Sequence, residues 1–135
     1  MTDRIAIERL LRRLHAARMS GDLTALLATF RDDVSLRIAG ASDGKPIAIA
    51  AKGIGQVRPW LSMLVRSFRL TDYTLLSLLI DGAAAAAPWQ VTIHSRITGT
   101  QVATELVDLV EVRGDKIASY TEFFTPRPDT SREPR

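Results

Sequence analysis

The sequence contains no cysteine, which excludes disulfide bonds and thiolate metal sites. Its only two histidines, His15 and His94, are far apart in the chain, so no metal site is indicated. No apolar run is long enough to span a bilayer, and the N-terminus lacks the apolar core of a signal peptide. No glycine-rich phosphate loop follows an expected strand either. We therefore expect a cytoplasmic protein that uses no cofactor and has no membrane partner.

The sequence also lacks a large excess of charge of one sign, because its net charge is only +3. The expected first helix carries five arginines that could attract nucleic acid, namely Arg4, Arg9, Arg12, Arg13 and Arg18. Such a row is more typical of a solvated helix face, so nucleic acid is not an expected partner. A chain of 135 residues is long enough for one domain with a sizeable core. We assign residues 1–125 to this domain and the proline-containing residues 126–135 to a disordered tail.

The C-terminal half predicts antiparallel strands. Apolar and polar residues alternate from Trp89 to Ile97, and the segment Val102–Arg113 is rich in β-branched residues. Thr98-Gly99 and Gly114-Asp115 separate these strands from each other and from a last strand, Ile117–Phe124. Asp81-Gly82 is a hairpin signal that leads into the alanines 83–87, which we interpret as strand because Pro88 would end a helix at once.

The N-terminal half predicts the helices that cover this sheet. Thr2 or Asp3 can cap a helix that runs to about Met19, with an apolar stripe formed by Ile7, Leu10, Leu11, Leu14 and Ala17. Asp22 caps a short second helix, and Gly53-Ile54-Gly55 opens a third, with Pro59 in its first turn. Strands are expected at Val34–Ile38, Ile47–Ala51 and Thr71–Ile80, and residues 40–46 are expected to form a loop.

This order of elements predicts an α+β fold: a cone-shaped, curved, six-stranded antiparallel or mixed sheet wrapped around three helices of the N-terminal half. A pocket is expected between the concave face of the sheet and the helices.

Three segments in this order resemble the nuclear transport factor 2-like superfamily. They are residues 17–34 with Gly21-Asp22-Leu23, residues 106–117, and the closing strand Tyr120-Thr121-Glu122-Phe123-Phe124. This superfamily includes ketosteroid isomerase, SnoaL-like polyketide cyclases and limonene epoxide hydrolase. The resemblance covers about residues 4–125 and implies a small-molecule pocket, and relatives often form dimers through the convex face of the sheet.

The resemblance carries over the chemistry of these relatives only in part. Ketosteroid isomerase uses a carboxylate base, a tyrosine and a protonated aspartate. Here Ile38 stands in the place of the base and Leu14 in that of the tyrosine, whereas Asp108 matches the aspartate. Steroid-type isomerisation is therefore not expected. In SnoaL-like cyclases an aspartate near the position of Asp108 serves as acid and base, which is consistent with this chain. Limonene epoxide hydrolase uses an arginine and two aspartates; Glu122 is near one of these, but the chain has no Arg-x-Asp on the preceding strands.

Asp108 is the first candidate catalytic residue because it interrupts an apolar row, where a carboxylate is unfavourable unless it is paired or protonated. The alternative is an exposed residue on the solvent side of the strand. Glu122 is the second candidate, and its orientation depends on the strand register. A three-residue turn at residues 114–116 places Glu122 opposite Asp108, whereas a turn of Gly114-Asp115 alone places Thr121 there. The resemblance favours the first arrangement.

The remaining candidates are expected to bind substrate. His15 lies next to Leu14 and can reach the mouth of the pocket, although a lone histidine on a mixed helix face is often structural. The other expected lining residues are Leu14, Ile38, Trp60, Trp89, Ile93, Thr104, Tyr120 and Phe124. His94 shares its strand face with polar residues and is expected at a homodimer interface on the convex face.

The sequence therefore predicts a SnoaL-like small-molecule pocket protein. In the first hypothesis, Asp108, assisted by Glu122 and Tyr120, moves protons on a small apolar or polyketide-like substrate without a cofactor. In the alternative, the same fold serves as a non-catalytic ligand-binding or dimeric scaffold module.

Overall fold

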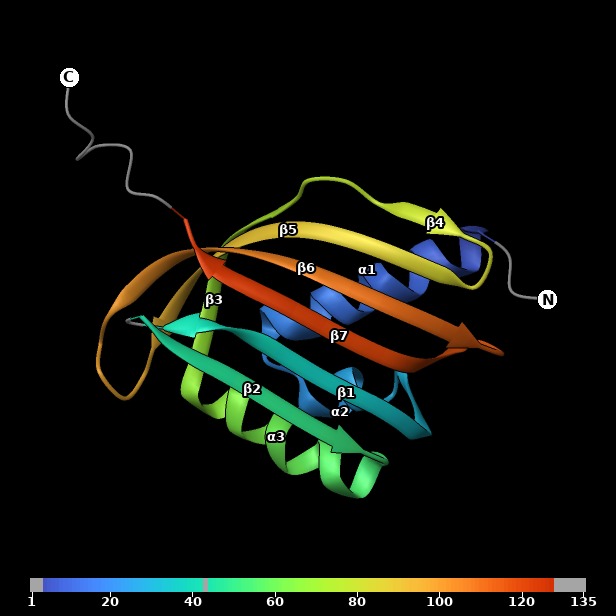
Figure 1. Cartoon of the computed structure of the whole chain (residues 1–135), viewed down its shortest axis with the longest axis horizontal. Coiled ribbons are helices and arrows are strands. Elements are labelled where there is room, and N and C mark those ends of the chain that lie inside the picture. The colour runs from blue at the N-terminus through green and yellow to red at the C-terminus, as the bar shows by residue number, and fades with distance from the viewer. Residues whose placement is uncertain (1–3, 43, 128–135) are drawn as a thin grey trace.

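The computed structural model describes residues 4–42 and 44–127, and within these ranges the chain forms three helices and one seven-stranded sheet (Figure 1). The helices are α1 (Arg4–Ser20), α2 (Leu23–Leu27) and α3 (Ile54–Ser67). The strands are β1 (Phe30–Ser42), β2 (Lys45–Lys52), β3 (Phe68–Leu75), β4 (Leu79–Asp81), β5 (Ala84–Ser95), β6 (Gln101–Arg113) and β7 (Lys116–Pro126). None of the described helices is both long and apolar enough to cross a membrane.

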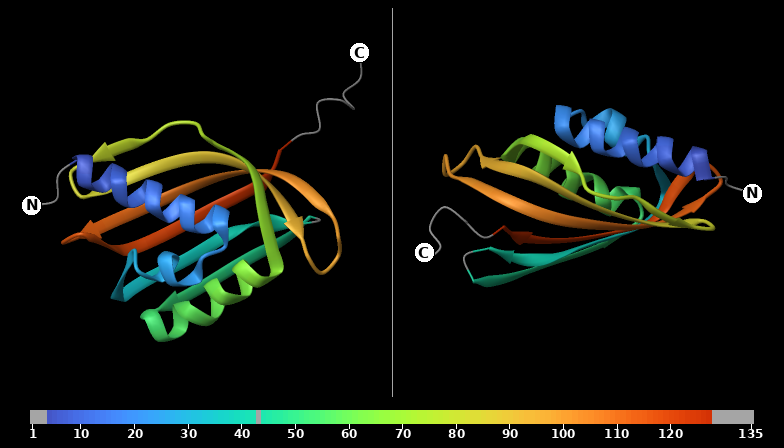
Figure 2. Two further views of the ribbon diagram at one scale, coloured as in Figure 1. Left: turned by 180° about the vertical axis from the view of Figure 1, so that it is seen from behind. Right: turned by 90° about the horizontal axis from the view of Figure 1, so that it is seen from above.

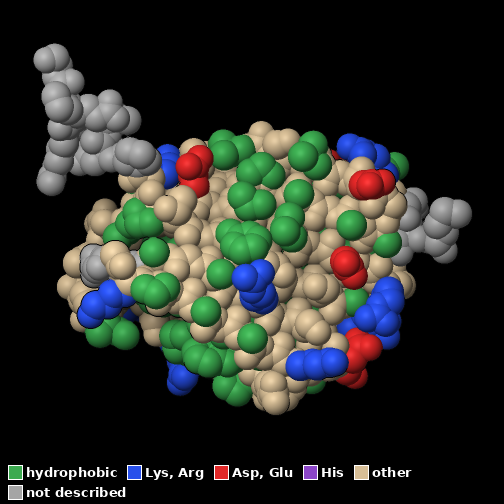
Figure 3. Space-filling model, in the orientation of Figure 1, with side chains coloured by type: hydrophobic (Ala, Val, Ile, Leu, Met, Phe, Trp, Pro, Cys, Tyr) green, Lys and Arg blue, Asp and Glu red, His purple; other side chains and the backbone are tan. Residues whose placement is uncertain are grey.

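The strands follow the order β2-β1-β7-β6-β5-β3, and β4 pairs with the opposite end of β5. The pair β1–β7 is parallel and all the other pairs are antiparallel. The helices lie together on one face of the strongly curved sheet (Figure 2). No helix of the described part of the chain covers the opposite face, and Figure 3 shows hydrophobic side chains gathered across it. The expected α+β cone is therefore confirmed.

The apolar stripe of α1 packs against the concave side of the sheet. Its five predicted members, Ile7, Leu10, Leu11, Leu14 and Ala17, are all buried. They belong to a large cluster that also contains residues of β1, β6 and β7. The Asp22 side chain accepts a hydrogen bond from the Ala25 backbone N–H at 3.0 Å, which caps α2 as predicted. The predicted caps Thr2 and Asp3 lie outside the described residues.

The expected loop at residues 40–46 is wrong, because β1 continues to Ser42 and β2 begins at Lys45. The composition around Gly40 predicted a loop, but in the structure Gly40 lies in a strand that packs closely against β7. A Cβ atom at Gly40 would lie 2.5 Å from the carbonyl oxygen of Phe124, its neighbour on β7. Glycine is therefore required by the close approach of the two strands.

Three other boundaries differ from expectation. The expected strand at Thr71–Ile80 is interrupted at residues 76–78, which splits off β4 and raises the strand count from six to seven. Pro59 is the sixth residue of α3 and not in its first turn. Of the expected disordered tail, Pro126 belongs to β7 and the Arg127 N–H donates to the Ala103 carbonyl oxygen at 2.7 Å, while residues 128–135 lie outside the described residues.

Two glycine substitutions test the packing argument. Gly40→Ala is expected to lower the free energy of unfolding by about 1–3 kcal/mol, because the methyl group overpacks the β1–β7 contact. Gly55→Ala is the matched control, since a Cβ at this helical position meets no atom within 4 Å. We expect it to stabilise the protein by about 0.5–1 kcal/mol. Urea denaturation measures both, and equal effects would contradict the role assigned to Gly40.

Candidate functional site

Asp108 and Glu122 are directly opposite each other on β6 and β7, and both side chains are buried on the helix-covered side of the sheet. The predicted pairing is confirmed, but the predicted reason is wrong. The turn comprises Gly114-Asp115 alone, since Arg113 pairs with Lys116. A β-bulge at Ala118 then shifts the register by one residue between Val112–Ile117 and Glu111–Ser119. The bulge, and not the turn, directs Glu122 inward.

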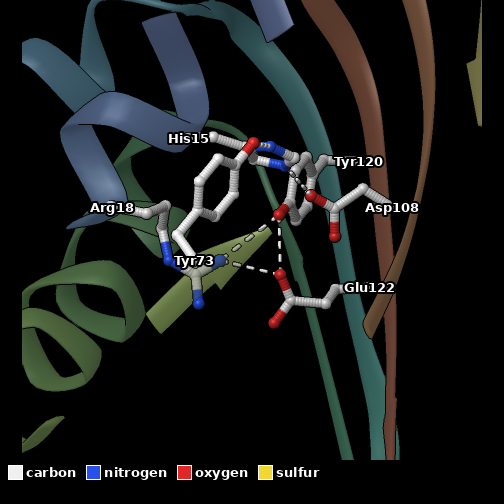
Figure 4. A network of polar contacts seen from close by, with 6 residues as sticks. All are labelled: His15, Arg18, Tyr73, Asp108, Tyr120 and Glu122. Carbon is white, nitrogen blue, oxygen red and sulfur yellow. Dashed lines mark hydrogen bonds and ion pairs between the residues drawn. The ribbon is translucent and has the colours of Figure 1, made fainter. Parts of the chain in front are cut away.

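Glu122 is held by two donors, which lie on different elements. The Arg18 guanidinium of α1 donates to Glu122 Oε2 at 2.7 Å, and the Tyr120 hydroxyl donates to the same oxygen at 2.7 Å (Figure 4). Arg18 also donates to the Tyr120 hydroxyl oxygen at 3.3 Å. Charge-assisted bonds of this length stabilise the ionised carboxylate. The ion pair therefore fixes α1 against β7.

Asp108 makes its hydrogen bond to α1 through a histidine. Asp108 Oδ2 is 2.8 Å from Nε2 of His15, and Nδ1 of His15 is 2.6 Å from the hydroxyl of Tyr73 on β3 (Figure 4). The side chains of His15 and Asp108 are 2% and 0% exposed. The expectation that His15 reaches the pocket mouth is therefore wrong, because it lies in the interior. The indole of Trp89 packs on the His15 ring, with 4.5 Å between the ring centroids.

Burial sets the protonation of the cluster. Desolvation raises the pKa of Asp108 and also that of Glu122, while the positive charge of Arg18 opposes the rise in both. Burial lowers the pKa of Arg18, but the neighbouring Glu122 carboxylate outweighs this effect and the pKa of Arg18 is raised. One buried cation can neutralise one carboxylate, and Arg18 contacts Glu122 directly. Arg18 therefore stabilises the ionised form of Glu122 more directly than that of Asp108, whose hydrogen-bond partner is His15.

Two buried polar atoms in this region have no hydrogen-bond partner within the described residues: Asp108 Oδ1 and Trp89 Nε1. Buried polar groups are rarely left unsatisfied. In the described part of the chain, Asp108 Oδ1 is thus the carboxyl oxygen without a close hydrogen bond, whereas Oδ2 is 2.8 Å from His15 Nε2.

The other predicted lining residues fall into three groups. Ile38 pairs with Glu122 in the parallel register, and Leu14 and Tyr120 are buried in the same hydrophobic cluster. A second cluster contains Trp89 with Ile93 and Phe124. Thr104 is buried, and its hydroxyl donates to the Val102 carbonyl oxygen of its own strand. Trp60 lies on α3 with 39% of its surface exposed and belongs to neither cluster, so the structure does not place it beside the carboxylates.

Sequence reasoning missed two residues of the cluster. Arg18 was assigned to the solvated face of the first helix, but its side chain is only 10% exposed and paired. Its spacing of three and four residues from His15 and Leu14 was a signal, because such residues share one helix face. Tyr73 offered no comparable signal, since its orientation depends on a register shift in β3 between Thr71 and Thr74.

A groove of about 590 Å³ lies at another place, where β4 and the start of α1 meet the sheet. Its lining includes Arg4, Leu79 and Glu111 but neither Asp108 nor Glu122. Asp108 and Glu122 are themselves buried, and Arg18 and the half-buried Tyr73 are the members of the cluster that reach solvent. Among the described residues, no group of three or more acidic or histidine side chains could hold a metal ion.

Comparison with known proteins supports the architecture. The SnoaL-like domain family matches residues 11–120. A candidate isomerase from Bacillus subtilis superposes with a TM-score of 0.79 at 16% identity, covering 93% of this chain and 90% of that one. An NTF2-like protein from Burkholderia xenovorans superposes with a TM-score of 0.71 at 16% identity, and the match covers 93% of both chains. An LEH-like epoxide hydrolase from M. tuberculosis superposes with a TM-score of 0.66 at 15% identity, covering 87% of this chain and 80% of that one. No curated protein matches the sequence.

The buried histidine predicts a pH dependence of stability. Burial, reinforced by the charge of Arg18, lowers the pKa of His15 from 6.5 to about 4. Between these values the unfolded chain binds more protons than the folded protein, so stability falls as the pH drops through this window. We expect wild type to lose about 2 kcal/mol more than His15→Gln between pH 7 and pH 5. Urea denaturation at both pH values measures this, and parallel losses would contradict the burial of a neutral His15.

Proposed function

This chain belongs to the SnoaL-like domain family, and we propose that it is a small-molecule pocket protein that catalyses proton transfer without a cofactor. One observation carries this proposal: two buried carboxyl groups face each other in different environments. Glu122 is paired with Arg18, whereas Asp108 contacts a histidine and retains one unpartnered oxygen. Pairs of titratable groups with different environments are suited to separate acid and base roles.

In the proposed mechanism Asp108 is the general acid and Glu122 the general base. Asp108 donates its proton from Oδ1 to an oxygen of the substrate, and Glu122 accepts a proton from a carbon or from water. Arg18 and Tyr120 hold the Glu122 carboxylate in position, since both bond to its Oε2. Transfers of this kind require a heavy-atom distance of about 2.6–3.2 Å between acid, base and reacting atom.

The substrate class follows from the side chains around the carboxylates. Leu14, Ile38, Trp89 and Phe124 provide apolar and aromatic surface on the same side of the sheet. A small apolar or polyketide-like molecule with one polar oxygen fits these surroundings better than a charged molecule does. The Arg18 guanidinium lies 5.5 Å from the indole centroid of Trp89 and adds a cation–π contact to these surroundings.

A second candidate function is a ligand-binding or scaffold module without catalysis. The observation that favours it is the closure of the cluster, because Asp108, His15, Trp89 and Glu122 are each at most 3% exposed. In this case the polar network holds α1 on the sheet, and Asp108 has no chemical role.

Substitution of Asp108 separates the two functions. Wild type is incubated in D₂O with a panel of small apolar ketones and epoxides, and deuterium incorporation or ring opening is followed by proton NMR. We expect Asp108→Asn to lower the rate by about 10²–10⁴-fold while the protein remains folded, because the general acid is lost. Glu105→Gln is a control, since Glu105 is exposed on the same strand and should leave the rate unchanged.

Three outcomes are informative for this experiment. A rate that survives Asp108→Asn would show that Asp108 is not the acid. Tight binding of an apolar ketone with no chemical change, in wild type and variant alike, would support the binding module. Unfolding of the variant would assign Asp108 a structural role.

We further propose that two copies of the chain associate through the helix-free face of the sheet. Val107 and Phe123 are opposite each other on this face, and Leu109 and Phe123 are 41% and 38% exposed. Exposed apolar patches of this kind mark interaction sites, and the resemblance to the nuclear transport factor 2-like superfamily implies dimers through this face. The predicted interface residue His94 bonds to Thr71 of β3 at 2.7 Å within its own chain.

Sedimentation equilibrium tests the association. Wild type is expected to be a dimer, and Leu109→Glu is expected to be a monomer with an unchanged far-UV circular dichroism spectrum, because a charge is placed in an apolar contact. Ile97→Glu is the matched control: Ile97 is 79% exposed in the turn between β5 and β6 and should not affect the dimer. A monomeric wild type would contradict the proposal.

A further inference from the structure

Tyr73 reaches the buried cluster through an irregularity in β3. The register with β5 shifts by one residue between Thr71 and Thr74, and Asp72 within this bulge has a φ of +58°. Positive φ is uncommon for residues other than glycine, and strain of this kind concentrates at functional sites. The bulge turns Tyr73 toward the interior, where its ring lies 5.4 Å from that of His15 and 5.8 Å from that of Trp89.

The lengths of the two hydrogen bonds of His15 indicate which atoms donate. The Tyr73 hydroxyl is 2.6 Å from Nδ1, a length typical of an O–H donor. His15 Nε2 is 2.8 Å from Asp108 Oδ2, within the range of an N–H donor to a carboxyl oxygen. His15 is neutral at pH 7, since burial and the Arg18 charge lower its pKa to about 4. It therefore carries one ring hydrogen, and both distances are compatible with that hydrogen on Nε2.

This tautomer determines which oxygen of Asp108 holds a proton. With Nε2–H donating to Oδ2, that oxygen is an acceptor, and the acidic hydrogen of Asp108 belongs on Oδ1. Oδ1 is the buried oxygen without a hydrogen-bond partner among the described residues. In the other tautomer Nε2 would be an acceptor and would draw the proton of Asp108 to Oδ2, away from a ligand.

We propose that Tyr73 is a positioning residue: by donating to Nδ1 it fixes the Nε2–H tautomer of His15 and thereby directs the proton of Asp108 to the free oxygen Oδ1. The consequence for catalysis rests on the proposed role of Asp108 as general acid. The tautomer itself does not depend on that role, because it is argued from the contacts of Tyr73, His15 and Asp108 and from the neutral state of the buried His15.

The experiment is ¹⁵N NMR of the histidine ring nitrogens at pH 7, with the signals of His15 and His94 assigned by His94→Gln. Wild type is expected to show His15 as the Nε2–H tautomer. In Tyr73→Phe the loss of one neutral hydrogen bond should lower the ratio of Nε2–H to Nδ1–H by about five-fold. Thr71→Val is the matched control, since it removes a hydroxyl that bonds to the other histidine, His94, at 2.7 Å and should not change the ratio for His15.

The wild-type spectrum decides first and does not depend on whether a variant folds. An Nδ1–H tautomer in wild type would overturn the proposal, and so would an unchanged ratio in a folded Tyr73→Phe. An Nε2–H tautomer that depends on Tyr73 in a protein without turnover would support the positioning role and reject the catalytic one. The failure of one proposal is thus distinguishable from the failure of the other.

Discussion

The burial of charge between α1 and the sheet is the constraint on which the rest of this structure depends. Removing an arginine and two carboxyl groups from water is unfavourable unless each finds a partner. Arg18 and His15, one helical turn apart on α1, supply those partners to Glu122 on β7 and Asp108 on β6. The helix can therefore occupy only one position along the strands. Apolar packing by Leu14 and its neighbours holds the layers together, whereas the polar contacts determine how they are aligned.

Two irregularities in the sheet make this alignment possible. The bulge at Ala118 turns Glu122 inward, and the shift at Asp72 turns Tyr73 toward His15. Because side chains alternate along a strand, each bulge reverses the side on which every following residue lies. Both bulges therefore direct polar side chains into an otherwise apolar interior. Such departures from regular strand geometry are typical of functional sites, where a particular arrangement of side chains matters more than the most stable backbone.

The same alternation separates two surfaces of the sheet. Residues at even positions of β6, such as Asp108 and Val110, face the helices, while odd positions, such as Leu109, face outward. The chemistry of the interior and the association proposed for the outer face therefore come from neighbouring residues on one strand. A change in the register of β6 would disturb both at once, and hydrogen bonds to β5 and β7 hold that register along most of the strand.

The sequence by itself determined the α+β class, the apolar stripe of α1, the cap at Asp22 and the presence of a hairpin after Asp81. All of these depend on neighbours in the chain, so periodicity and turn chemistry reveal them. Only the tertiary structure decided that His15 and Arg18 pair with the carboxyl groups, that Gly40 lies within a strand, and that Tyr73 joins the cluster. These features depend on strand register and on contacts between residues 58 to 104 positions apart. Local patterns do not encode such contacts, because a bulge of one residue redirects a whole strand with little change in its composition.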